Sequence, residues 1–209
     1  MKVRMSKFST VVVSVLIVLY MTSNLCSAQE PRRTGKYEFS GIFHGGDTFQ
    51  AKYTDLGEEL SIDGGPNSGG FGFGYNFNEN LNVNTSFIFG STDIEIKNLS
   101  GGMIGEGDTD FFLSNVNLDY NIMKDSFTPF VTGGIGYVKY DGNLKYNGNP
   151  NSESIDSSDF SWNLGAGLRW DVSEKWLLKA TYATNWTELD DADDTSRFWS
   201  VSLSLGYKF

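Results

Sequence analysis

The feature that most constrains this chain is a period-two alternation of apolar and polar residues, in segments of roughly ten residues. The clearest case is the last segment, FWSVSLSLGYKF, at 198–209. One set of alternate positions carries Trp199, Val201, Leu203, Leu205, Tyr207 and Phe209, and the other carries Ser200, Ser202, Ser204, Gly206 and Lys208. Successive side chains of an extended strand point to opposite faces. The pattern therefore predicts a strand with one large apolar face and one small polar face.

Seven other segments alternate in the same way. They lie at 36–46, 69–77, 81–92, 110–122, 128–140, 160–172 and 176–186. Short turns follow the second, fourth and sixth segments, at 78–80, around 124–125 and at 173–175, and long polar loops follow the others, near 47–68, 93–109, 141–159 and 187–197. An even strand number with short turns on one side and long loops on the other is typical of outer-membrane barrels. We therefore expect an all-β fold, an eight-stranded antiparallel up-and-down transmembrane β-barrel over 36–209, with both ends on the short-turn, periplasmic side.

The apolar face decides between a membrane barrel and a soluble one. A soluble eight-stranded barrel packs its apolar face inside, where space is limited. Aromatic residues make up 15% of this chain, and several lie on each apolar face, more than a narrow lumen could hold. The opposite faces carry small or polar residues, such as Gly70, Gly72 and Gly74. We therefore expect the apolar faces to meet lipid, with aromatic girdles at both boundaries and the first strand paired with the last.

The amino terminus has the form of an export signal. Lys2, Arg4 and Lys7 precede an apolar run at 11–21, and small residues follow as far as Ala28. The run is shorter than the about 20 residues that a transmembrane helix needs. We expect a signal peptide at 1–28, cleaved after Ala28, followed by a short N-terminal segment at 29–35. A lipoprotein site at Cys26 and an uncleaved anchor are the alternatives.

The terminal strand carries a family resemblance. Its alternating Val201, Leu203, Leu205, Tyr207 and Phe209 resemble the C-terminal signal by which the barrel assembly machinery recognises outer-membrane proteins. With the signal peptide and eight strands, the chain is similar to the small outer-membrane barrels of the OmpA/OmpX type, over essentially all of its mature length. This resemblance implies export, assembly by that machinery and residence in the outer membrane of a Gram-negative cell.

Strand parity places several charged residues on the inward face. Glu38, Asp119, Arg169 and Lys179 are predicted to form a charge network in the lumen, because buried charges must be paired. Lys36 and Asp171 share this face or lie in water at the periplasmic rim. An ion network that fills the lumen predicts a plugged barrel, and a narrow gated pore is the alternative.

The predicted loops are strongly acidic. One contains Asp190, Asp191, Asp193 and Asp194, and another contains Asp55, Glu58, Glu59 and Asp63. These loops are either simply solvated or bridged by divalent cations to lipopolysaccharide, since hard cations prefer carboxylate oxygens. The net charge of −10 argues against binding nucleic acid.

Enzymatic activity is not expected. The single histidine, His44, lies near the extracellular end of the first strand, and no serine follows it closely as a nucleophile. We expect no catalytic residues, metal or cofactor. The expected role is structural or one of surface interaction. The alternative is passive transport of ions, small solutes or small hydrophobic molecules.

Overall fold

The computed structural model describes residues 33–46, 49–53, 58–62, 68–98, 103–146, 152–187 and 196–209. The predicted signal peptide lies outside these residues. Within them, no helix is long and apolar enough to span a membrane. The strands are β1 (Tyr37–Gly46), β2 (Phe49–Tyr53), β3 (Glu58–Ile62), β4 (Ser68–Asn76), β5 (Leu81–Asn98), β6 (Met103–Asn121), β7 (Phe127–Tyr146), β8 (Ser152–Asp171), β9 (Trp176–Thr187) and β10 (Ser196–Lys208).

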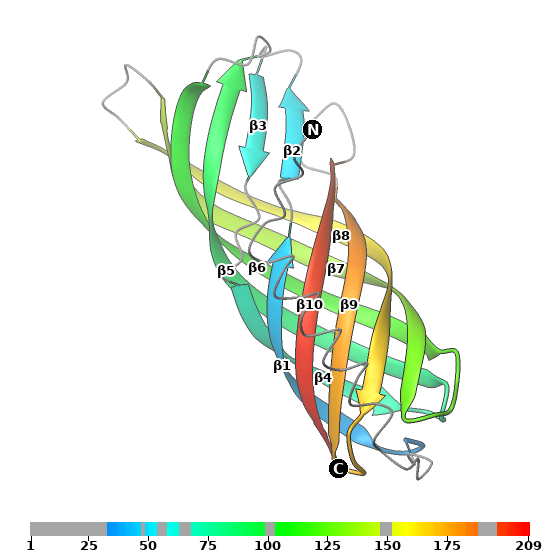
Figure 1. Cartoon of the computed structure of the whole chain (residues 1–209). Helices are drawn as coiled ribbons and strands as arrows, with labels where there is room; N and C mark the ends of the chain where they lie inside the picture. Colours follow the sequence, from blue (N-terminus) through cyan, green and yellow to red (C-terminus); the bar gives the residue numbers. More distant parts are fainter. Residues whose placement is uncertain are drawn as a thin grey trace, which may run out of the picture.

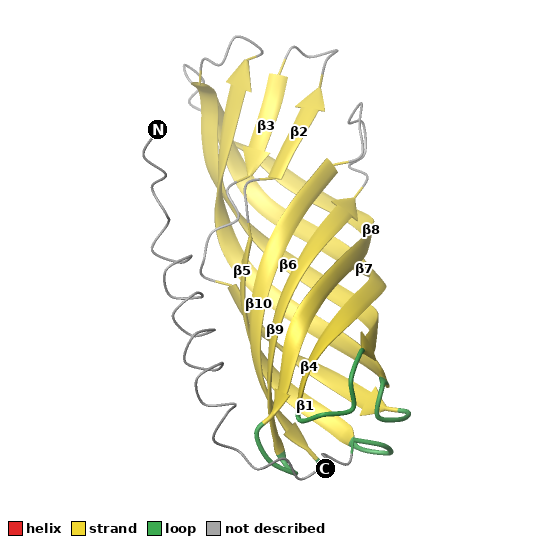
Figure 2. Ribbon diagram, turned by 45° about the vertical axis from the view of Figure 1, so that its right-hand side comes forward, coloured by secondary structure: helices red, strands yellow, loops and turns green. Residues whose placement is uncertain are grey.

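Eight of these strands close an antiparallel barrel (Figure 1). The order around it is β1, β4, β5, β6, β7, β8, β9 and β10, and β10 pairs with β1 from Glu38↔Lys208 to Gly46↔Ser200. The turns after β4, β6 and β8 are short and lie at the same end as the C-terminus, which we call the short-turn end (Figure 2). The predicted fold class is confirmed.

The predicted loop at 47–68 is wrong, because it contains β2 and β3. β2 begins three residues after the end of β1 and pairs with β3, which in turn pairs with β5 from Ile62↔Ile94 to Glu58↔Asn98. At the long-loop end, β2 and β3 therefore extend the paths of β1 and β4. Ten strand segments thus follow eight paths around the molecule.

The loops predicted at 93–109 and 141–159 are mostly strand as well. β5 and β6 stay paired as far as Lys97↔Met103, and β7 and β8 as far as Lys145↔Ser152. In these segments the side chains still alternate, but the outward positions are polar and the inward positions are mostly apolar. Among the side chains described, Asp93, Asp108, Asp110, Asp141 and Asp156 are exposed on the outward face, whereas Leu113, Val138 and Tyr140 are buried inward. Acidic residues at the outward positions of a strand resemble loop residues in the sequence, which explains the error.

The pairing register fixes the size of the barrel. One row of partners can be followed around the whole barrel: Arg197, Trp186, Trp162, Ile135, Val116, Thr85, Phe73, Phe39 and finally Tyr207. The row returns to β10 ten residues beyond Arg197. With about 3.3 Å per residue and about 4.8 Å between strands, this displacement tilts the strands by about 40° and gives a backbone radius of about 8 Å. Such a lumen has room for side chains and little else.

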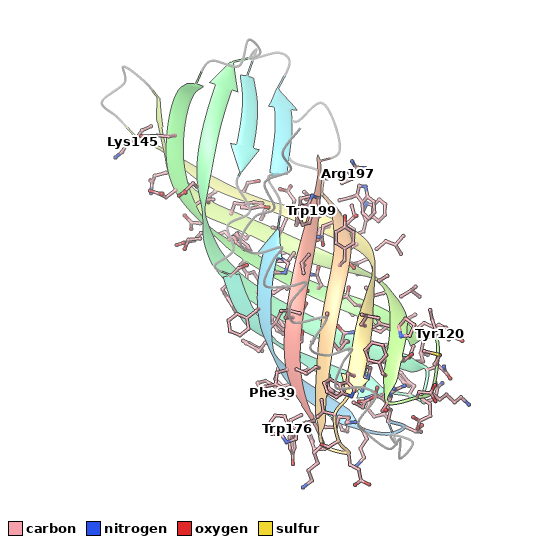
Figure 3. The ribbon with its side chains drawn as sticks, in the orientation of Figure 1. Phe39, Tyr120, Lys145, Trp176, Arg197 and Trp199 are labelled. Carbon is pink, nitrogen blue, oxygen red and sulfur yellow. The ribbon has the colours of Figure 1, made fainter. Side chains whose placement is uncertain are left out.

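Inside and outside differ as the sequence predicts. Outward aromatic residues are exposed along the strands, and Figure 3 shows Phe39 and Trp176 near the short-turn end and Trp199 near the opposite end of β10. Inward positions hold small or polar residues, including Ser200, Asn163 and Asn115, which are buried. One inward row is apolar instead: Ile88, Leu113 and Val138 are partners across β5, β6 and β7.

Candidate functional site

The lumen is crossed at the short-turn end by a cluster of charged side chains, which we call the basal cluster: Arg33, Glu38, Arg169, Asp171 and Lys208. Asp171 accepts from Arg33 Nε at 2.6 Å and from Lys208 Nζ at 2.8 Å. Arg169 Nη2 lies 3.0 Å from Asp171 Oδ1 and 2.5 Å from Glu38 Oε1. All five side chains are buried or nearly so. Three cations thus share two carboxylates, and together they join β1, β8 and β10 to the chain before β1.

Arg33 lies before β1 and ties the turns together. Its Nη1 donates to the carbonyl oxygens of Glu79 at 3.0 Å and Met123 at 3.3 Å, and its Nη2 donates to that of Asp125. One side chain therefore connects the β4–β5 turn, the β6–β7 turn and Asp171 at the end of β8. A turn closed by the Lys36 amide on the Arg33 carbonyl directs the chain into β1, and Gly35 supplies its positive φ of 76°.

Glu79 holds the other side of this segment. Its carboxylate accepts from Thr34 Oγ1 at 2.8 Å and from the amides of Arg33 and Thr34 at 3.2 Å. Burial by itself would raise the pKa of Glu79, but these hydrogen bonds and the charge of Arg33 outweigh it and lower the pKa below its ordinary value. Glu79 is thus held as a carboxylate at the short-turn end.

Lys179 and Asp119 form a separate pair further into the lumen. Lys179 Nζ lies 2.5 Å from Asp119 Oδ2 and 5.0 Å from the centre of the Phe130 ring. The four lumen charges singled out in the sequence therefore fall into two groups, since Glu38 and Arg169 belong to the basal cluster.

Two members of the basal cluster, Lys208 and Arg33, were not predicted from the sequence, and Asp171 was predicted with two alternatives. Asp171 is fully buried, so the alternative that places it in water at the rim is wrong. Lys208 shares the polar face of the last strand with Ser204, and this parity was the signal that could have found it. Arg33 lies outside every alternating segment, so no periodic signal points to it.

A polar cavity of about 90 Å³ occupies the lumen beyond the basal cluster. Hydroxyl and amide side chains line much of it, among them Ser40, Asn84, Asn117, Thr132, Thr181, Ser202 and Ser204. Leu113 and Ile88, from the inward apolar row, also line it, as does His44. A cavity of this size and polarity has room for several water molecules.

A family model, described as the outer membrane protein beta-barrel domain, matches residues 17–209. The chain belongs to this family. It is accordingly an outer-membrane eight-stranded barrel protein, and its outward apolar face is the surface that meets lipid. A search of curated proteins finds no match.

Solved structures share the barrel at low sequence identity. OprG from Pseudomonas aeruginosa is 17% identical, with a TM-score of 0.59 over 86% of this chain and 98% of that one. Neisserial surface protein A is 14% identical, with a TM-score of 0.53 over 88% and 100%. Ail, the attachment invasion locus protein of Yersinia pestis, is 20% identical, with a TM-score of 0.50 over 84% and 99%. At these identities the likeness shows the fold alone.

His44 has serines beside it in this outer-membrane barrel, although none follows it in sequence. Ser68 and Ser202 are its register partners on the two neighbouring strands. However, the hydroxyl of Ser68 donates to the His44 carbonyl oxygen at 2.6 Å. His44 Nδ1 has no hydrogen-bond partner among the described residues, so no carboxylate there orients the ring.

The acidic groups proposed for divalent cations lie mostly outside the described residues. This applies to the group at 190–194 and to Asp55 and Asp63, while Glu58 and Glu59 are described by their place in β3 alone. Elsewhere in the described part of the chain, no three His, Cys, Asp or Glu residues come together as a metal site.

The C-terminal residue closes the outer-membrane barrel at the short-turn end. Phe209 and Tyr37 exchange two backbone hydrogen bonds, both of 3.0 Å, and their rings stack with centroids 6.0 Å apart. All five residues of the predicted assembly signal lie on the outward face of this edge: Val201, Leu203, Leu205, Tyr207 and Phe209. Their recognition by the assembly machinery stays a prediction.

Proposed function

We propose that this outer-membrane barrel is non-enzymatic and non-conducting, with a structural or surface-interaction role. Residues 1–28 are removed on export, 29–35 form a short N-terminal segment, and the short-turn end faces the periplasm of a Gram-negative cell. The observation that carries this proposal is the basal cluster. A solute leaving the lumen there would have to separate buried ion pairs at 2.5–3.0 Å in a barrel of about 8 Å backbone radius.

The opposite end supports a role at the cell surface. β5 to β8 continue as paired strands well beyond the ends of β1 and β4, and Figure 1 shows them rising on one side of the barrel with β2 and β3. Paired strands present side chains in a fixed pattern, in contrast to irregular loops. We call the part of β2, β3 and β5 to β8 at the long-loop end the upper sheet, and we expect this surface to contact neighbouring molecules.

Planar-bilayer recording of the mature protein, residues 29–209, tests the closed lumen. We expect no reproducible conductance steps. Steps in the wild type that disappear in Ser202→Phe would contradict the proposal, because Ser202 lines the cavity. Leu205→Phe is the matched control, since Leu205 lies on the outward face of the same strand and is exposed. Heat-modifiable electrophoretic mobility establishes that each variant has folded.

Passive transport is the second candidate function. It is favoured by the polar cavity, which begins directly beyond the basal cluster and runs past Lys179 to His44. Conduction would require the cations of the basal cluster to exchange partners. The same recordings decide between the two candidates.

A further inference from the structure

Three tryptophans and one arginine lie together on the outside of β8, β9 and β10 at the long-loop end. We call this surface the indole face, and it consists of Trp162, Trp186, Arg197 and Trp199. Arg197, Trp186 and Trp162 are consecutive partners in one row across the three strands. Trp199 lies two residues from Arg197 on the same side of β10. Figure 3 shows Arg197 and Trp199 projecting from this end of the strand.

The indole rings pack in pairs with neighbouring rings and remain partly exposed. The Trp162 and Trp186 rings are stacked with centroids 3.9 Å apart and planes at 8°. The Trp199 ring packs against the Tyr182 ring, with centroids 5.9 Å apart. Trp162 and Trp199 each keep 40% or more of their surface exposed, so the face is open to a ligand.

The indole face carries one charged side chain, that of Arg197. Among the described outward positions of β9 and β10, Arg197 is the one charged residue. Arg197 is exposed, and none of the ion pairs found within the described part of the chain involves it. On β6 and β7 the outward positions at this end carry charges of both signs: Asp108, Asp110 and Asp141 with Lys139 and Lys145. Arg197 is therefore an exposed cation that has no ion-pair partner among the described residues and can pair with an anion from outside the chain.

The indole face also lies at the correct height for a lipid head group. Arg197 and Tyr207 are ten residues apart on the outward face of β10. At about 3.3 Å per residue and a tilt of about 40°, they are separated by about 25 Å along the membrane normal, the thickness of the apolar band of such barrels. With Tyr207 in the girdle at the short-turn end, Arg197 lies at the other lipid boundary.

We propose that the indole face binds the phosphorylated sugar head group of lipopolysaccharide in the outer leaflet. The guanidinium of Arg197 offers planar paired N–H groups that match a phosphate, and the indole N–H groups can donate to sugar oxygens while the rings remain in the lipid. The inference rests on the orientation given under the proposed function, in which the long-loop end faces outward.

Titration of the folded mature protein with purified lipopolysaccharide in detergent tests this site, with bound ligand counted by native mass spectrometry. We expect Arg197→Gln to weaken binding about fivefold, because one basic residue near an anionic surface contributes about 1 kcal/mol. Trp186→Leu, which removes one indole, is a second variant and should also weaken it. Lys145→Gln is the matched control, since Lys145 is an exposed cation on the opposite side of the upper barrel, as Figure 3 shows, and its loss should change nothing.

Unchanged lipopolysaccharide affinity in both Arg197→Gln and Trp186→Leu would overturn the proposal, as would an equal loss in Lys145→Gln. Equal binding of phosphatidylglycerol vesicles by the wild type would show that any anionic lipid suffices and would also overturn it. So would complete loss of wild-type binding on chelation of divalent ions, which would assign the contact to the acidic loops. Conductance by the wild type would refute the closed lumen and leave these binding results intact.

Discussion

At the scale of single residues, Asp171 decides whether the short-turn end can close. Its carboxylate is shared by Arg33, Arg169 and Lys208, which come from the chain before β1, from β8 and from β10. Each of these cations is buried, so its desolvation cost must be offset by a close partner. Removing this one anion would therefore leave the basal cluster with three cations and one carboxylate, that of Glu38, which contacts Arg169.

We predict that Asp171→Asn lowers the free energy of unfolding by about 3–5 kcal/mol, the cost of breaking a buried ion pair from one side. Urea unfolding of the barrel in lipid vesicles measures this. The control is Asp141→Asn, because the Asp141 side chain is 72% exposed and an exposed pair contributes little. Similar unfolding midpoints for Asp171→Asn and the wild type would show that the basal cluster does not stabilise the fold.

Glu79 gives a pH dependence with a definite sign. Its pKa is lowered in the folded barrel, so its stabilising contribution is fully present above its unfolded pKa of about 4.5 and is lost as pH falls through the folded pKa. We predict that the wild type exceeds Glu79→Gln in stability at pH 7 and that the difference shrinks as pH falls below about 4.5. Urea unfolding at several pH values measures it. A difference that grows on acidification would contradict the assigned sign.

At the scale of elements, β6 and β7 approach one another so closely that some positions accept no side chain. A Cβ atom at Gly134 would lie 2.1 Å from Asn117 Oδ1 and 2.3 Å from the Val116 carbonyl oxygen. The second of these is backbone and cannot rotate away. At Gly41, on the outward face of β1, nothing lies within 4 Å of the same atom.

We predict that Gly134→Ala destabilises the barrel by about 1–3 kcal/mol through overpacking. Gly41→Ala should be neutral or stabilising by up to about 1 kcal/mol, because alanine reduces the entropy of the unfolded chain. The comparison needs equilibrium unfolding of both variants under one set of conditions. Equal effects would mean that close packing of β6 on β7 does not determine the cost.

The strands also show why their lengths were underestimated. Period-two alternation is a local property of the sequence. The predicted strands end where outward apolar residues stop, near Phe89 on β5 and Phe112 on β6. In the structure the strands continue, with Asp93 and Asp108 directly opposite one another. Outward polarity follows the surrounding medium, so the change marks the boundary of the lipid and not the end of the strand.

At the scale of the whole molecule, closure converts eight similar strands into a barrel with distinct ends. The ten-residue displacement of the pairing register sets the radius of the barrel. A lumen of that radius is too narrow to hydrate an inward charged side chain fully, so each such charge needs a partner of opposite sign. The basal cluster and the Lys179–Asp119 pair follow from this constraint. The function proposed for the chain depends on closure more than on any one strand.

The sequence by itself determined the number of barrel strands and the face of each that meets lipid, because alternation and turn length are local signals. The pairing of the first strand with the last followed from the need to close backbone hydrogen bonds in lipid. It also placed Glu38, Asp119, Arg169 and Lys179 on the inward face by parity. Tertiary structure alone decided which of these charges meet, because their partners on other strands lie 60 to 131 residues away in sequence. It also decided the place of Arg33, whose contact with Asp171 spans 138 residues and has no periodic signal.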